Sequence, residues 1–115
     1  MTKKEKLLRE LNEAYANNDS DYIIENVTDD IQWDIIGDRL IKGKENFMKA
    51  ITEMAGDTPY QLTISHIITH GDSAAVDGTM KTPDGNTYAF CDIYKFSGFK
   101  NAKIKKMTSY AIHVK

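Results

Sequence analysis

Two aspartates, Asp77 and Asp92, lie in β-prone segments on either side of a predicted turn, where together they could do acid–base chemistry. The turn is Pro83-Asp84-Gly85-Asn86, in which glycine tolerates a positive φ and proline presets the first turn residue. If the loop holds two or four residues, antiparallel pairing sets Asp77 directly against Asp92. Their carboxyl groups would lie about 5 Å apart. At an effective dielectric near 20 they would repel by roughly 3 kcal/mol, so the pair would share one proton near neutral pH.

The same turn leaves a second pairing open. A three-residue loop would shift the strands by one position and send the two acids to opposite faces of the sheet. Asp77 is also followed by Gly78, and a glycine inside a strand often marks a bulge, which would let Asp77 point to solvent.

Asp92 is a candidate whichever pairing forms. Period-two alternation places it on an aromatic face with Tyr88, Phe90, Tyr94 and Phe96. This bulky face should pack against the helices, and burial among aromatic rings raises the pKa of a carboxyl group. The predicted catalytic group is therefore Asp92, helped by Asp77 or His66; the structural alternative is a buried acid that bonds a hydroxyl group or a water.

His66 shares its strand alternation with Leu62, Ile64 and Ile68, so it could line the interior. A neutral imidazole there could assist proton transfer, although a core or interface histidine fits equally well. His66 and His70 would lie about 13 Å apart on a strand, too far to share an ion. We therefore expect no metal site and no cofactor.

The elements that must position these residues follow from hydrophobic periodicity. The spacing predicts a helix from Lys3 to about Asn17, a short helix that begins at Asp19 or Ser20 and carries Val27, a strand over Ile31–Ile35, a helix from about Gly43 to Ala55, and strands over Tyr60–His70, Asp72–Lys81, Thr87–Ser97 and Lys103–Val114. Helices grouped on one side of an antiparallel sheet make an α+β domain, here a single one over residues 1–115.

Composition narrows the classes of partner. The chain has 115 residues, 41% of them hydrophobic and 28% charged, and a net charge of −2. This charge gives no general attraction to nucleic acid or to anionic membranes, so we expect neither as a partner. No apolar run approaches a membrane span, no signal peptide opens the chain, and the one cysteine, Cys91, fits a reducing compartment, so the predicted location is cytoplasmic. We interpret Lys103, Lys105 and Lys106 as a solvated strand edge.

Five short segments, in this order, resemble a known superfamily. They are Asn17-Asn18-Asp19, Asp29-Asp30-Ile31-Gln32-Trp33, Ile41-Lys42-Gly43-Lys44-Glu45, Cys91-Asp92-Ile93-Tyr94-Lys95-Phe96 and Lys103-Ile104-Lys105-Lys106-Met107. The chain resembles SnoaL-like proteins of the nuclear transport factor 2-like superfamily, which includes polyketide cyclases and ketosteroid isomerase. The resemblance implies a cone: three N-terminal helices packed on a strongly curved, mainly antiparallel sheet, a cystatin-like roll with an apolar cavity at its open end.

The resemblance also implies roles for particular residues. Asp92 falls where ketosteroid isomerases carry an acid that donates a hydrogen bond to the substrate oxygen. An Asp77–Asp92 pair would also resemble the polyketide cyclases of this family, which carry an acid–base pair on the same sheet. The isomerase's general base, however, falls at Ile35 and its helical tyrosine at Leu11, so that activity is not expected. The Asp–Arg–Asp set of limonene epoxide hydrolase is not matched either, because neither Arg9 nor Arg39 lies on the predicted sheet.

The cavity would hold a small apolar or carbonyl-containing molecule. Its expected wall, or alternatively plain core, is Tyr15, Trp33, Met48, Phe90, Tyr94 and Met107. Two other functions stay open. One is a cofactor-free isomerase, cyclase or dehydratase that uses Asp92. The other is a non-catalytic dimerisation module whose cavity is plugged by Trp33, Met48 and Met107.

The face of the sheet without helices is expected to be apolar and to form a homodimer. Its predicted residues are Ala74, Val76, Gly78, Met80, Ala89, Cys91, Ile93, Tyr110 and Ile112.

Overall fold

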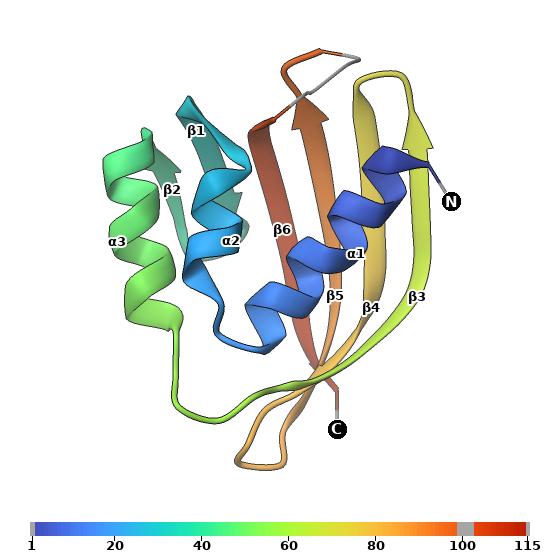
Figure 1. Ribbon diagram of the computed structural model, residues 1–115. Coiled ribbons are helices and arrows are strands. Elements are labelled where there is room, and N and C mark those ends of the chain that lie inside the picture. The colour runs from blue at the N-terminus through green and yellow to red at the C-terminus, as the bar shows by residue number, and fades with distance from the viewer. Residues whose placement is uncertain (1, 99–102, 115) are drawn as a thin grey trace.

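Three helices pack on one face of a six-stranded sheet in the computed structural model, which describes residues 2–98 and 103–114 (Figure 1). The elements in chain order are α1 (Lys3–Ala16), α2 (Ser20–Glu25), β1 (Val27–Ile35), β2 (Arg39–Lys42), α3 (Lys44–Met54), β3 (Gln61–His70), β4 (Ser73–Lys81), β5 (Thr87–Phe96) and β6 (Ile104–Val114). None of the described helices is long and apolar enough to cross a membrane.

Side-chain caps and apolar stripes explain the helices. The Thr2 hydroxyl accepts a hydrogen bond from the Glu5 amide at the start of α1, and the Asp19 carboxylate accepts one from the Tyr22 amide at the start of α2. Residues at helical spacing along α1, such as Leu8 and Leu11, are buried against the sheet. The helix-covered face of the sheet therefore holds the hydrophobic core.

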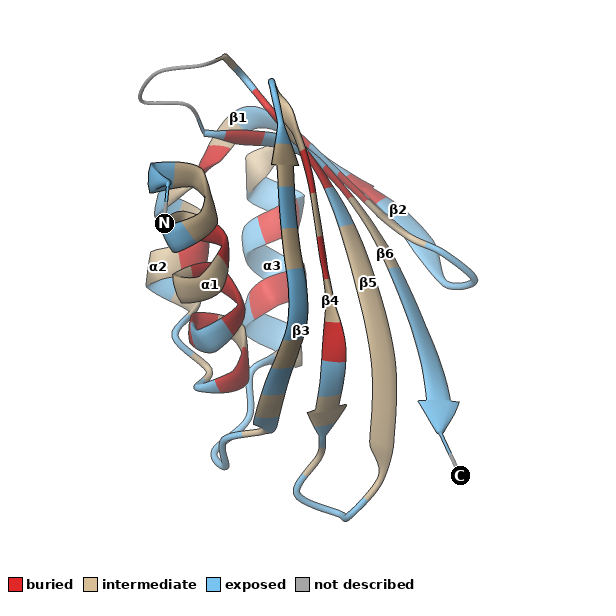
Figure 2. Ribbon diagram, turned by 90° about the vertical axis from the view of Figure 1, so that its right-hand side faces the viewer, coloured by how far each residue is buried: buried red, intermediate tan, exposed pale blue. Residues whose placement is uncertain are grey.

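The strand order is β2-β1-β6-β5-β4-β3, with β1 and β6 parallel and every other neighbouring pair antiparallel. The sheet curves around the helices and leaves its outer face, the one away from the helices, uncovered (Figure 2). This arrangement confirms the predicted α+β fold with its curved, mainly antiparallel sheet.

Three local expectations were wrong. The strand β2 was not predicted, because four residues after the Gly37 turn give too short a pattern. Val27 begins β1 rather than continuing α2. The strand that carries Lys105 and Lys106 lies between β1 and β5 in the middle of the sheet, so these exposed lysines are not at a strand edge.

The turn between β4 and β5 settles which strand register forms. The Thr82 amide donates to the Asn86 carbonyl at 2.8 Å, and Gly85 has a φ of +92°, which makes a three-residue loop. Asp77 therefore pairs with Cys91, and Asp92 pairs with Val76. Of the two pairings that the sequence left open, the one with a three-residue loop forms, so the two acids lie on opposite faces of the sheet and do not share a proton.

A β-bulge in β3 turns His66 away from the interior. The pairing shifts between Ile64, which lies opposite Gly78, and His66, which lies opposite Asp77. The extra residue reverses the alternation, so Ile67 rather than His66 faces the core. The expectation that His66 lines the cavity was wrong for this reason.

The register also reassigns the two faces of β4. Ala74, Val76 and Gly78 are buried beneath the helices, and Ala75, Asp77 and Thr79 lie on the outer face instead. The predicted outer face was therefore wrong for β4, where Met80 lines the interior too. The predicted outer face is correct for β5, where the Ile93 side chain is 43% exposed.

The bulge predicts that Gly78 tolerates no side chain. A Cβ built on Gly78 would lie 2.0 Å from the Thr63 carbonyl oxygen, which belongs to the backbone of the bulged strand. We expect Gly78→Ala to lower the free energy of unfolding by at least about 2 kcal/mol in urea denaturation. The matched control is Gly56→Ala, since nothing lies within 4 Å of a Cβ there. Equal stabilities of the two variants would contradict this packing.

Candidate functional site

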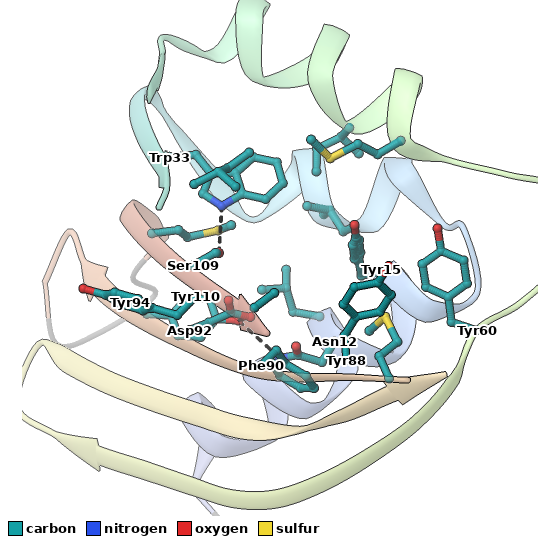
Figure 3. Close-up of a pocket in the computed structure, with 18 of the residues that line it drawn as sticks. Asn12, Tyr15, Trp33, Tyr60, Tyr88, Phe90, Asp92, Tyr94, Ser109 and Tyr110 are labelled. Carbon is teal, nitrogen blue, oxygen red and sulfur yellow. Dashed lines mark hydrogen bonds between the residues drawn. The ribbon is translucent and has the colours of Figure 1, made fainter. Parts of the chain in front are cut away.

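A cavity of about 320 Å³ lies between the helices and the curved sheet (Figure 3). Its walls are mainly apolar and aromatic side chains from α1, α3, β1, β5 and β6, together with Tyr60 just before β3. The few polar side chains that reach it include Asn12, Asp92 and Ser109. A volume of this size is at the lower end of the range for small-molecule sites.

The strands fix where the polar groups lie. On β5, alternation points Phe90, Asp92 and Tyr94 into the cone. On β6, Ser109 pairs directly with Asp92, and Met107 pairs with Tyr94. Asp92 is thus in the central part of the sheet, between β4 and β6, where it is partly buried in the cavity wall.

A chain of hydrogen bonds ends on the Asp92 carboxylate from both sides. The Tyr94 hydroxyl donates to Asp92 Oδ2 at 3.3 Å and accepts from Asn12 Nδ2 at 3.2 Å. On the other side Ser109 hydrogen-bonds Asp92, and Ser109 Oγ accepts from Trp33 Nε1 at 2.8 Å.

The direction of this chain is fixed by its two outermost groups. The indole N–H of Trp33 and the side-chain amide N–H₂ of Asn12 can only donate, so each hydroxyl accepts from one side and donates to Asp92 on the other. Asn12 is itself held by a bond from its Nδ2 to the Leu8 carbonyl at 2.8 Å. Asp92 is therefore the common acceptor of the network.

Burial dominates the electrostatics of Asp92. Desolvation raises its pKa to about 6, although the hydrogen bonds from Ser109 and Tyr94 act in the opposite direction. Burial, Tyr60 and the Asp92 charge raise the pKa of Tyr15 to about 12. A carboxyl group with this pKa can accept or release a proton near neutral pH, whereas the Tyr15 phenol stays protonated.

Five of the six predicted wall residues line the cavity: Tyr15, Trp33, Phe90, Tyr94 and Met107. The sixth, Met48, lies on α3 outside the lining and is 43% exposed, so its placement in the wall was wrong. The cavity is hollow where Trp33, Met48 and Met107 were expected to plug it, which removes the plugged form of the dimerisation module.

Asp77 and His66 lie away from Asp92. His66 Nδ1 is 2.8 Å from Asp77 Oδ1 on the outer face, and neither residue lines the cavity. The structure thus brings these two candidates together with each other but not with Asp92. Among the described residues, no group of three His, Cys, Asp or Glu side chains is arranged to hold a metal ion.

Sequence reasoning found Tyr94 but missed three other residues of the site, Ser109, Asn12 and Tyr60. Ser109 is two residues after Met107 on the same face of β6, so strand periodicity could have found it. Asn12 is a polar residue within the apolar stripe of α1, one turn after Leu8, and this break in the stripe was the available signal. No local pattern marks Tyr60, which lies in the segment before β3.

The buried charge of Asp92 makes stability depend on pH. Because its folded pKa of about 6 is above the unfolded value, the folded state binds more protons between pH 4 and 6. The free energy of unfolding should fall by about 3 kcal/mol as pH rises through this range. In Asp92→Asn this contribution is absent, so urea denaturation should show the variant gaining stability relative to the wild type as pH rises from 4 to 7. A difference that is constant with pH would contradict the assignment.

Comparison with solved structures places this fold among known proteins. An NTF2-like protein of unknown function from Cytophaga hutchinsonii is 27% identical, with a TM-score of 0.69 over 94% of this chain and 98% of the other. A putative ketosteroid isomerase from Kribbella flavida is 16% identical, with a TM-score of 0.78 over 96% and 78%. An LEH-like epoxide hydrolase of M. tuberculosis is 16% identical, with a TM-score of 0.76 over 93% and 80%.

The positions of the isomerase's base and helical tyrosine, by the resemblance, are Ile35 and Leu11. Both line the cavity as apolar residues, which leaves Asp92 as the one carboxylic acid among its described lining residues. No curated protein matches this chain. The family model described as a SnoaL-like domain matches residues 8–107, which is most of the chain, so the protein belongs to the SnoaL-like family.

Proposed function

We propose that the protein binds a small, mainly apolar, carbonyl-containing molecule in this cavity. The observation that carries the proposal is one carboxyl group, the only one among the described residues that line this mainly apolar cavity, held by Ser109 and Tyr94. Both neighbouring hydroxyls donate to Asp92, so the proton of its acid form is left to donate to a ligand. A carbonyl oxygen is the matching acceptor, and the apolar walls bind the rest of the ligand by burial.

Acid–base catalysis on such a ligand is the second candidate, and the pKa of about 6 at Asp92 favours it. The carboxylate would take a proton from the carbon next to the carbonyl group and return it to another atom, which is the chemistry of a cofactor-free isomerase, cyclase or dehydratase. The proposal is supported by two structural neighbours that are named for small-molecule chemistry, an LEH-like epoxide hydrolase and a putative ketosteroid isomerase. Asp92 would act without a second carboxylate from the described lining residues.

Cyclohexyl methyl ketone tests both candidates. Trp33 is the only tryptophan and lines the cavity, so its fluorescence reports binding. The fraction of protonated Asp92 falls from about 0.9 at pH 5 to about 0.01 at pH 8, so the apparent affinity should fall by up to about 90-fold. If Asp92 is also a base, proton NMR in D₂O should show that the protein accelerates exchange of the ketone's α-protons.

Two variants sharpen this experiment. Asp92→Asn keeps an N–H donor, so it should still bind the ketone but without the pH dependence and without exchange. Asp77→Asn, on the outer face, is the matched control and should behave as the wild type. Ketone binding that is absent, or independent of pH in the wild type, would contradict the proposal.

We also propose that the outer face forms a homodimer. Ile68, Ala75 and Ile93 lie opposite one another on β3, β4 and β5, and their side chains share this uncovered face. Ile68 is 62% exposed, and Ile112, further along the same face, is 70% exposed. Exposed apolar side chains gathered on one sheet face are typical of an association surface.

The dimer predicts a change of mass on substitution. Ile93→Asp places a charge in the centre of the outer face and should convert a dimer into a monomer in sedimentation velocity experiments. Met48→Asp, an equally exposed site on α3, is the matched control and should stay dimeric. A monomeric wild type would remove the proposal.

A further inference from the structure

We propose that the same cavity, with Asp92 ionised, binds small apolar amines as ammonium ions. The positive nitrogen would lie against the Asp92 carboxylate, and the hydrocarbon part would lie against the aromatic walls. The inference rests on the proposed function in one respect only, namely that the cavity accepts a small apolar molecule.

Asp92 is a partly buried acid with no positive partner among the described residues that line the cavity. None of the described residues that line the cavity is a lysine, arginine or histidine. The hydrogen-bond partners of Asp92 are the neutral hydroxyls of Ser109 and Tyr94. A buried carboxylate that lacks a positive partner is costly, and a cationic ligand would supply that partner.

Aromatic rings form a large part of the cavity wall. Tyr15 on α1, Trp33 on β1, Tyr60 before β3, and Phe90 and Tyr94 beside Asp92 on β5 all line the cavity. In Figure 3 the Trp33 ring lies on the same side of the cavity as the Asp92 carboxylate, and the Tyr15–Tyr60 pair lies across the cavity from both. Aromatic rings attract ammonium ions through their π-faces, most strongly where water is excluded.

The charges of the residues that line the cavity predict an order of affinity among ligands of different charge. An anion in the cavity would meet the Asp92 carboxylate without a cation among the described lining residues, so carboxylates should be excluded. A neutral alcohol keeps the contacts of its hydrocarbon part but gains no charge pairing. At pH 8 an amine should therefore bind more tightly than its isosteric alcohol, and the alcohol more tightly than the carboxylate.

The charge state of Asp92 sets the pH dependence. With a pKa of about 6 it is ionised in about 0.1 of the molecules at pH 5 and about 0.99 at pH 8. Of the other titratable groups around it, burial raises the pKa of Tyr15 and Tyr94 above their usual values, so both phenols stay neutral. Two further titratable side chains are near but do not line the cavity. Cys91 lies on the outer face of the sheet, and the His113 ring packs on the ring of Tyr88, with 5.2 Å between the ring centroids.

The test compares cyclohexylmethylamine, cyclohexylmethanol and cyclohexanecarboxylate by Trp33 fluorescence and by the NMR signal of the Trp33 indole N–H. At pH 8 the amine should bind at least tenfold more tightly than the alcohol. Its affinity should fall by up to about tenfold at pH 5, opposite in sign to the ketone. Asp92→Asn should abolish the preference for the amine and keep the alcohol, whereas Asp77→Asn should keep the preference. Circular dichroism checks that both variants fold.

The outcomes separate this inference from the proposed function. If amine and alcohol bind equally well, the amine inference is wrong and the cavity still accepts apolar ligands. If the amine binds equally well to Asp92→Asn, the inference is also wrong, because the carboxylate does not recognise the ion. If the alcohol and the ketone bind but the amine does not, only the inference fails. If none of the probes binds, both proposals fail.

Discussion

The candidate site depends on one carboxyl group that is partly buried in the cavity wall and surrounded by hydrogen-bond donors. Burial favours the neutral form of Asp92, and the hydroxyls of Ser109 and Tyr94 favour the charged form. Their opposition places the pKa near 6, so neither form is strongly disfavoured at neutral pH. Trp33 and Asn12 fix the direction of the donors from outside. The rest of the fold holds these four partners around one acid.

Two backbone details decide which residues can join Asp92. The three-residue loop at Gly85 sets the register of β4 against β5, and the bulge opposite Gly78 reverses the alternation along β3. Together they place the Asp77–His66 pair on the outer face, away from the cavity. Over the part of the chain that the structure describes, the cavity is thus left with a single carboxylic acid, and a ligand would supply any second charge.

The sequence predicted every element except β2, and also the inward face of β5, because hydrophobic periodicity is local and Asp92 lies within a run of alternating aromatics. It did not predict that Asp77 and His66 contact each other on the outer face. One inserted residue in a strand, or one residue more or less in a turn, moves the following side chains to the opposite face of the sheet without changing the composition. Met48 fits the apolar stripe of α3 but projects beyond the cavity. Asn12 and Ser109 carried signals that acquire meaning only when α1 and β6 are placed beside β5.

The most direct test of this account is the titration of the Asp92 side-chain carboxyl carbon by NMR in the unliganded protein. The account predicts a midpoint near pH 6, raised by burial, and a downward shift when cyclohexylmethylamine is present, because a bound cation favours the carboxylate. A midpoint near pH 4 would mean that water reaches this group freely. It would contradict the claim that a desolvated acid is the centre of the site.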